Sequence, residues 1–484
     1  MRASYWLLIP VILATAGCAP RRSVTPPIAT TPTAPAVPPV DVTGLMQHGC
    51  FRCLERALDA ATGEQAFEVA TLLTLRAKEL GLPYDEYRSR AAAAAPPDPA
   101  FATYLLAVDA IPADALSGER YRRDPAPPIR LERDAAGAPV RPPSPAERAT
   151  GWRDGLRSGP GSATFRRYID IALGCTLVPR TAETPAPVLT PAEREVPILR
   201  YRIGLCGTDV ADFRAFRAAD PEFVDGDFPL AKIALNSQPA DLDEALRLMQ
   251  SAHAAFPTSM AITTSLGAVY DQREEWGTAL MIYEEAIALM PRHRDALLGR
   301  TVALSHLARH DEAIASATQM IELGDWLLGE AYYWRAWNAF SLQQYPAARD
   351  DTDRARSRMV NAAVFVLSGL VEWNLLRLPT AESEFEEALK MDFGRCDAAR
   401  FLGRVRVQRN KVPEALAAFQ QAIQCFDLSI TVRQKLVADI QAGAGSDATK
   451  ARLTAGHQRA IASAIADRDE CRQNVAALEK RGTQ

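Results

Sequence analysis

A small residue that returns about every 34 positions is the feature that most limits how this chain can fold. The small residue is alanine each time, and successive copies are 34, 34, 35, 33 and 34 residues apart: Ala245, Ala279, Ala313, Ala348, Ala381 and Ala415. A second residue, usually also alanine, follows each of them seven positions later: Ala252, Ala286, Met320, Ala355, Ala388 and Ala422. A period of this length indicates stacked supersecondary units that bury their apolar faces against one another.

The segment from Leu266 to Pro291 shows the pattern of one unit most fully. Its marked positions are Leu266, Gly267, Tyr270, Ala279, Tyr283, Ala286 and Pro291. At these spacings the segment resembles the tetratricopeptide repeat (TPR), a pair of antiparallel helices. We expect Ala279 to lie where the second helix closes on the first, and Gly267 to allow close approach from the opposite helix. Pro291 ends the unit because proline cannot continue a helix.

The position four residues after the recurring alanine is bulky in most units but not in all. Met249, Tyr283, Phe385 and Phe419 occupy it in four of them. Ala317 and Thr352 occupy it in the other two, so the repeats that begin near residues 294 and 329 match the pattern more loosely.

The expected fold is therefore all-α: a TPR α-solenoid of about six helix-turn-helix repeats with an irregular helical N-terminal region. We place the array at residues 223–427. Before it, residues 44–95 read as a helical hairpin with a Cys-x-x-Cys motif, and residues 96–222 as an irregular, partly Pro-rich helical region in which Tyr121–Pro145 is a loop. After the array, residues 428–484 are expected to form C-terminal capping helices, including one long helix.

The first residues resemble a bacterial lipoprotein signal. A short apolar run follows Arg2 and ends in TAGC, which resembles a lipobox, although Thr15 stands where leucine is usual. The run is too short to span a membrane, so residues 1–17 read as a cleaved signal peptide. The resemblance implies lipidation of Cys18, a Pro/Thr-rich tether over residues 18–43, and an outer-membrane lipoprotein that faces the periplasm. An ordinary secretory signal with an incidental cysteine is the alternative.

Export permits disulfides among the seven cysteines that remain. The candidate pairs are Cys50–Cys53, Cys175–Cys206 and Cys396–Cys425, which leaves Cys471 alone; spacing by itself does not establish connectivity.

Sequence motifs for catalysis, metals and nucleic acids are weak. The net charge of −4 offers no basic excess for phosphates, so nucleic acid is not an expected partner. HGCFRC, from His48 to Cys53, lacks the histidine that haem attachment needs after the second cysteine, and a zinc site would need a fourth ligand from elsewhere. His306 and His310 are four apart, but no acidic residue at helical spacing completes a metal set. We expect no catalytic residue, metal or cofactor.

The TPR resemblance implies a groove lined by the first helix of each repeat. In the register of the recurring alanine, Tyr333, Trp337 and Phe340 fall on inner positions of one repeat and Trp373 on the next. One repeat further, the inner positions are arginines, Arg400 and Arg404, whose guanidinium groups suit a partner's carboxylate. Tyr332 and Trp334 fall off the inner positions and are expected in the core.

These features favour a membrane-anchored scaffold that binds a protein or peptide partner in the cell envelope, with an assembly or adaptor role. Two alternatives stay open. The same aromatic residues suit a peptidoglycan or glycan binder, and the irregular region 96–222 has room for the site of an envelope hydrolase.

Overall fold

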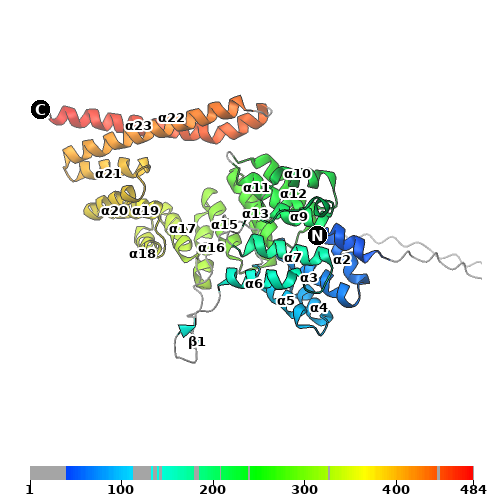
Figure 1. The fold of residues 1–484 in the computed structure, drawn as a ribbon. Helices are drawn as coiled ribbons and strands as arrows, with labels where there is room; N and C mark the ends of the chain where they lie inside the picture. Colours follow the sequence, from blue (N-terminus) through cyan, green and yellow to red (C-terminus); the bar gives the residue numbers. More distant parts are fainter. Residues whose placement is uncertain are drawn as a thin grey trace, which may run out of the picture. The chain divides into compact units, whose positions relative to one another are not determined.

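The computed structural model describes residues 40–112, 132–133, 139–140, 144–178, 185–207, 209–237, 240–324, 327–443 and 447–482. The predicted signal peptide, Cys18 and the tether as far as residue 39 lie outside these ranges, as does most of the predicted loop Tyr121–Pro145. Within that loop, two short strands pair antiparallel, β1 (Glu132–Arg133) with β2 (Pro139–Val140). All other regular elements of the described residues are helices (Figure 1). None of these helices is both long and apolar enough to cross a membrane.

Ten helices and one 3₁₀ turn precede the repeats. They are α1 (Val42–His48), α2 (Phe51–Ala60), α3 (Gly63–Glu79), α4 (Asp85–Ala94), α5 (Pro99–Ala110), α6 (Pro145–Arg157), α7 (Ala163–Thr176), α8 (Pro191–Arg194), α9 (Pro197–Leu205), α10 (Val210–Ala219) and η1 (Val224–Gly226). The central helix is α3, whose residues are buried almost without a break from Phe67 to Glu79. A helix that is buried on all sides needs partners for its polar side chains as well as its apolar ones.

Arg76 of α3 is the largest of these buried polar side chains. It is fully buried, forms an ion pair with Asp225 of η1, and places its guanidinium carbon 3.4 Å from the centre of the Tyr201 ring. The Asp225 carboxylate also accepts a hydrogen bond of 3.2 Å from the backbone N–H of Phe51. This one ion pair therefore links α3 to the start of α2 and to the turn that precedes the repeats.

Glu79 continues the buried network one turn further along α3. It forms an ion pair with Arg202 of α9 and accepts a hydrogen bond of 3.2 Å from the hydroxyl of Tyr168 on α7. Burial raises the pKa of the Tyr168 hydroxyl well above its usual value, so the phenol keeps the proton that it donates. Three helices from separate parts of the chain thus meet at one carboxylate.

Six helix pairs follow, and they give the chain its TPR α-solenoid. The pairs are α11 (Asp227–Leu235) with α12 (Leu242–Ala255), α13 (Met260–Gln272) with α14 (Trp276–Leu289), α15 (Arg294–His306) with α16 (His310–Leu323), α17 (Leu328–Ser341) with α18 (Tyr345–Arg356), α19 (Ala362–Asn374) with α20 (Leu378–Met391), and α21 (Cys396–Gln408) with α22 (Val412–Ala442). Each recurring alanine lies on the second helix of its pair and is fully buried. Helices therefore pack at close range wherever this residue occurs.

Packing between the two helices of a repeat depends on a complementary pair of side chains. A Cβ atom added to Gly369 would lie 2.6 Å from the Phe385 ring, and one added to Gly403 would lie 2.7 Å from the Phe419 ring. In the third repeat the bulky ring is replaced by Ala317, and the residue at the glycine position is Thr301, with both side chains fully buried. The third repeat therefore departs from the pattern on both helices, with a larger residue in place of glycine and a smaller one in place of the ring.

The turn between the two helices of a repeat has a left-handed residue in every repeat from the second to the sixth. These residues are Glu274, Ala308, Gln343, Leu376 and Asn410, with φ between 56° and 61°. In the fifth repeat the N–H of Arg377 donates to the carbonyl of Glu372 at 2.9 Å, and that of Leu376 to Trp373 at 3.0 Å. This is the Schellman arrangement, which satisfies the last carbonyls of a helix.

Replacing Leu376 by glycine should stabilise the protein. The side chain is 82% exposed, so its removal forfeits little packing, while a left-handed φ costs a residue with a Cβ atom about 1–2 kcal/mol. After the greater flexibility of glycine in the unfolded chain is subtracted, we expect a gain of about 0.5–1 kcal/mol in the free energy of unfolding. Urea denaturation measures the gain, and Leu376→Ala is the control, because alanine keeps the unfavourable φ. A gain for the alanine variant as well would show that the backbone is not the cause.

The last repeat does not end where the sequence suggested a boundary. Helix α22 continues without a break past residue 427 as far as Ala442, and α23 (Asp447–Gly482) then returns along it (Figure 1). Ala464, Cys471 and Leu478 of α23, seven residues apart, are buried against the last repeat. At the other end of the same helix, Arg459 forms an ion pair with Glu274 in the turn of the second repeat. The C-terminal helices thus contact two distant repeats.

Candidate functional site

The inner positions of the third and fourth repeats surround a cavity of about 460 Å³. It is lined by Ser305, His306, His310, Tyr333, Trp334, Trp337 and Ser341, from α15, the start of α16 and α17. We call this cavity the aromatic hollow. Trp337 is 37% exposed at its opening, which is unusual for so large an apolar side chain.

Stacked rings form the walls of the aromatic hollow. The His306 ring lies nearly parallel to that of Trp276, with 3.8 Å between centroids and 6° between planes. Trp334 lies 6.4 Å from His306 and packs edge-on against Tyr333 at 5.5 Å. Burial lowers the pKa of His306, which favours the uncharged imidazole. The walls are therefore aromatic and carry little charge near neutral pH.

Hydrogen bonds at the base of the aromatic hollow keep its shape. The buried amide of Asn338 donates at 2.7 Å both to the Ser305 hydroxyl and to the Trp334 carbonyl, and its oxygen lies 2.8 Å from Nδ1 of His310. Because these bonds link α15, α16 and α17, the rings are held in place before anything binds. A preformed site loses less entropy when it binds a ligand.

The predicted groove residues lie in several different surroundings. Tyr333 and Trp337 line the aromatic hollow together. Phe340 is half-buried against Tyr345, 5.7 Å between centroids. Trp373 donates from Nε1 to Gln408 at 2.8 Å and packs against Phe401, so its ring bridges two repeats.

Arg400 and Arg404 have carboxylate partners within the chain itself. Arg400 lies 2.9 Å from Glu470 and 3.0 Å from Asp467, and Arg404 also forms an ion pair with Glu470. Both acidic residues belong to α23. The expectation that these arginines are free for a partner therefore needs correction, because acidic residues of a helix about 70 residues further on pair with both of them.

Trp334, Tyr332 and the stack of Trp276 on His306 lie in surroundings that were not predicted from the sequence. Trp334 was expected in the core, but it lines the aromatic hollow together with Tyr333 and Trp337 of the same helix. Tyr332 is also not a core residue: the guanidinium carbons of Arg335, Arg354 and Arg358 lie 5.3–5.5 Å from its ring. The stack of Trp276 on His306 joins the second and third repeats. Comparing residues of one repeat with those of the next, and not only residues within one repeat, is the sequence signal that could have found it.

Among the cysteines that the structure describes, the pairs are Cys50–Cys53, Cys175–Cys206 and Cys396–Cys425, and Cys471 is free. The second pair joins the ends of α7 and α9, and the third joins the two helices of the sixth repeat. Burial raises the pKa of the Cys471 thiol to about 11, so this thiol is unreactive at neutral pH.

Neither a family model nor a curated protein matches the chain. Among solved structures it is similar to MamA, at 22% identity over 33% of this chain and 94% of MamA, with a TM-score of 0.31. It is similar to YrrB, described as a TPR protein with an unusual peptide-binding site, at 20% identity over 37% of this chain and 91% of YrrB, with a TM-score of 0.31. It is also similar to the type IV pilus biogenesis factor PilW, at 13% identity over 46% of this chain and 94% of PilW, with a TM-score of 0.36. The fold of this chain follows from its own helix pairs and turns, and its function does not follow from these likenesses.

Proposed function

We propose that this protein is a scaffold of the bacterial cell envelope that captures a protein partner through the inner face of its TPR solenoid. Lipidation at Cys18 anchors it to the outer membrane, and the Pro/Thr-rich tether carries the folded part into the periplasm. The partner contributes an apolar or aromatic side chain that enters the aromatic hollow. The protein performs no catalysis in this role.

The observation that carries the proposal is the exposed ring of Trp337 above a preformed aromatic cavity. Large rings with few rotatable bonds contribute much of the binding energy at protein interfaces, and they do so best in cavities that exclude water. Such a ring is unfavourable on a surface that remains in water, so its position favours a surface that is covered when the protein acts.

The contact between α23 and the sixth repeat supports the same mode of binding. There the inner arginines hold the carboxylates of a helix from the same chain, at 2.9 Å between Arg400 and Glu470. Arginines on the first helix of a repeat thus hold the carboxylates of another helix, in the repeat where the chain supplies that helix. The third and fourth repeats offer aromatic walls in place of arginines, which suits a partner segment that is apolar rather than acidic.

Replacing Trp337 by alanine should abolish partner capture and leave the fold intact. The protein from Ala19 onward is immobilised, envelope extract is passed over it, and retained proteins are identified by mass spectrometry. For the partner so found, we expect a loss of about 2 kcal/mol in binding free energy, or roughly thirtyfold in Kd. Circular dichroism should show unchanged helicity because the ring is outside the repeat core.

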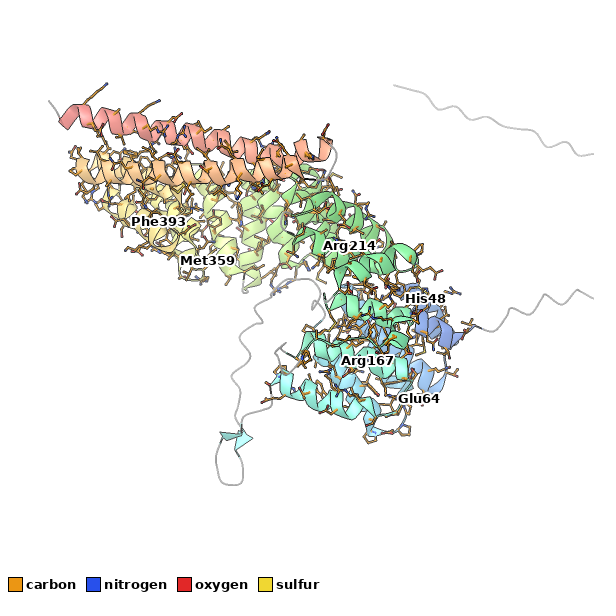
Figure 2. All side chains as sticks on the ribbon, turned by 45° about the horizontal axis from the view of Figure 1, so that its top comes forward. His48, Glu64, Arg167, Arg214, Met359 and Phe393 are labelled. Atoms are coloured by element: carbon orange, nitrogen blue, oxygen red, sulfur yellow. A yellow bond between two sulfur atoms is a disulfide. The ribbon has the colours of Figure 1, made fainter. Side chains whose placement is uncertain are left out.

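Phe393→Ala is the matched control for this experiment. Phe393 is 71% exposed in the loop between α20 and α21, outside the aromatic hollow (Figure 2). Its removal should not change capture. If both variants bind the partner as the wild type does, the inner face is not the binding surface and the scaffold proposal fails in this form. If Trp337→Ala loses helicity, the ring is part of the core.

The same rings suit one other class of ligand, because aromatic faces also stack on sugar rings. Co-sedimentation with purified peptidoglycan separates the two: a peptidoglycan binder sediments with it, and loses that property in Trp337→Ala. The hydrolase alternative depends on region 96–222, where Ser162 begins α7 and its hydroxyl donates to Glu68 at 2.7 Å. A screen of the purified protein against esters, peptides and glycosides is the direct measurement of that alternative.

A further inference from the structure

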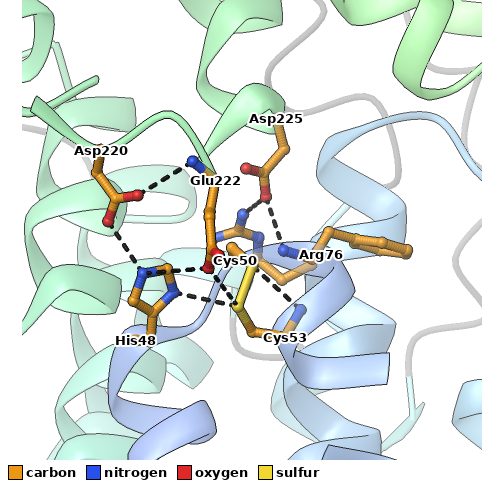
Figure 3. Close-up of a disulfide and its surroundings, with 8 residues drawn as sticks. His48, Cys50, Cys53, Arg76, Asp220, Glu222 and Asp225 are labelled. Atoms are coloured by element: carbon orange, nitrogen blue, oxygen red, sulfur yellow. Dashed lines mark hydrogen bonds and ion pairs between the residues drawn. A yellow bond between two sulfur atoms is a disulfide. The ribbon is translucent and has the colours of Figure 1, made fainter. Parts of the chain in front are cut away.

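The start of α2 brings two cysteines, a histidine and a glutamate together (Figure 3). His48 ends α1, Cys50 and Cys53 open α2, and Glu222 comes from the segment before η1, about 170 residues away in the sequence. One ligand atom from each of the four side chains lies within 4.8 Å of all the others. No second group of this kind occurs in the parts of the chain that the structure describes.

The separations suit a tetrahedral metal ion. Nδ1 of His48 lies 3.2 Å from Sγ of Cys53, and Oε2 of Glu222 lies 3.6 Å from the same sulfur. With Zn–S near 2.3 Å and Zn–N or Zn–O near 2.1 Å, ligand atoms of a tetrahedral zinc site are about 3.5 Å apart. The fourth ligand, which the cysteine motif lacks in its own part of the sequence, is thus supplied by the fold.

The histidine is oriented as a metal ligand would be. Its other ring nitrogen, Nε2, lies 3.0 Å from the carboxylate of Asp220, and its ring stacks on Phe223 with 5.2 Å between centroids. A neutral imidazole that donates its Nε2 proton to a carboxylate presents the lone pair of Nδ1 on the opposite side. Metal-binding histidines usually have such a carboxylate behind them, where it fixes the tautomer and raises the basicity of the ring.

The backbone around the four side chains is held firmly. Gly49 has a φ of 74°, and a Cβ atom there would collide with Ile198, so the chain turns sharply between His48 and Cys50. The N–H of Cys53 donates to Sγ of Cys50 at 3.1 Å, and the N–H of Phe51 to Asp225 at 3.2 Å. The N–H of Cys53 thus points toward the Cys50 sulfur at the N-terminus of α2, which favours a thiolate there.

We propose that the reduced form of this protein binds one Zn²⁺ ion through Cys50, Cys53, His48 and Glu222. In the structure the two cysteines form a disulfide, which offers no thiolate to a metal. A dithiol converts the disulfide into two thiols by supplying two electrons and two protons and becoming a disulfide itself. A phosphine supplies two electrons and becomes a phosphine oxide, and water supplies the oxygen and the two protons. Zinc then replaces both thiol protons, which are released to solvent, and binds the two thiolates, the imidazole and the carboxylate. The metal form and the disulfide form exclude each other.

A route for the metal exists on the glutamate side. The sulfur atoms are buried, but the side chain of Glu222 is 65% exposed and that of His48 is 29% exposed. Zinc thus reaches the cluster from solvent through the two residues that are not sulfur ligands.

Cobalt(II) is the probe for the test, because tetrahedral thiolate coordination gives it strong charge-transfer and visible absorption. The purified protein is reduced with a phosphine under argon and titrated with Co²⁺, and zinc is then added to displace the cobalt. We expect one equivalent of cobalt with a tetrahedral spectrum, displacement by zinc, and no binding to the oxidised protein.

Four variants make the assignment specific. Cys50→Ser with Cys53→Ser should abolish the spectrum, while Cys396→Ser with Cys425→Ser, which removes another disulfide of the same chain, should leave it unchanged. Glu222→Gln alters an exposed side chain that the fold does not need, and should weaken zinc binding at least tenfold. Asp220→Asn should weaken it about 10–100-fold, because Asp220 only positions the histidine.

The proposal is overturned if the reduced protein binds no stoichiometric metal, or if binding persists without Cys50 and Cys53. It is also overturned if Glu222→Gln and Asp220→Asn bind zinc as tightly as the wild type, because two thiolates alone then account for the binding. Exchange of the Cys50–Cys53 disulfide with dithiols in the absence of any metal binding would identify a redox pair instead. None of these outcomes depends on the aromatic hollow, so the scaffold proposal is tested separately.

Discussion

Replacing Arg76 by methionine should destabilise the protein by about 3–5 kcal/mol. Arg76 is fully buried, and its removal leaves the carboxylate of Asp225 in the interior without its counter-charge. Loss of one member of a buried ion pair is far more costly than loss of both, because the remaining charge is neither solvated nor neutralised. Urea denaturation followed by circular dichroism measures the effect on the N-terminal region.

Arg88→Met is the matched control, since Arg88 forms an ion pair with Asp109 at 2.7 Å on the surface. Both side chains of that pair are accessible to water, so we expect a loss of no more than about 1 kcal/mol. Adding Asp225→Asn to Arg76→Met should restore part of the stability, because the amide oxygen still accepts the bond from Phe51 without a charge. Equal effects of Arg76→Met and Arg88→Met would contradict the assignment of a buried network.

The second large loss of stability is expected from changes at the contact between α19 and α20, the two helices of the fifth repeat. Phe385→Ala removes a fully buried ring and should cost about 3–5 kcal/mol. Gly369→Thr inserts a side chain where a Cβ atom alone would lie 2.6 Å from that ring, and should cost about 1–3 kcal/mol. Thermal and urea unfolding of each single variant measure these losses.

The double variant Gly369→Thr with Phe385→Ala should be more stable than the sum of the single losses by 1 kcal/mol or more. It reproduces the pair that the third repeat already has, where Thr301 and Ala317 are both fully buried and the Thr301 hydroxyl donates to the Leu297 carbonyl at 2.7 Å. Gly277→Thr is the steric control, because nothing lies within 4 Å of a Cβ atom at that glycine. Strictly additive losses would show that the two positions do not compensate for each other.

Much of the fold was predictable because the repeat signal is local. The recurring alanines and the glycines opposite the bulky rings lie at contacts within one helix pair, and the proline marks where the pair ends. Sequence spacing alone is enough to predict features of this kind. The inner positions were predictable for the same reason, and Tyr333 and Trp337 do line one cavity.

Contacts between distant segments were not predictable in this way. The sequence has no periodic sign that α23 returns to Arg400 and Arg404, or that a tryptophan off the inner positions lines the aromatic hollow. Both results depend on where whole helices lie after folding. The end of the repeat array was also uncertain, since α22 has no helix-breaking residue near 427 and simply continues.

The sequence by itself thus determined that this protein is a stack of helix pairs, because a period of about 34 residues places each small residue against its partner helix. Only the tertiary structure decided which chemistry the stack presents. It set Glu222 and Asp220 beside His48, Cys50 and Cys53, and it covered some inner residues while leaving Trp337 exposed. The reason is physical: helix formation and repeat packing depend on neighbours within some 40 residues, whereas a binding site depends on side chains that the chain brings together only when the helices have packed.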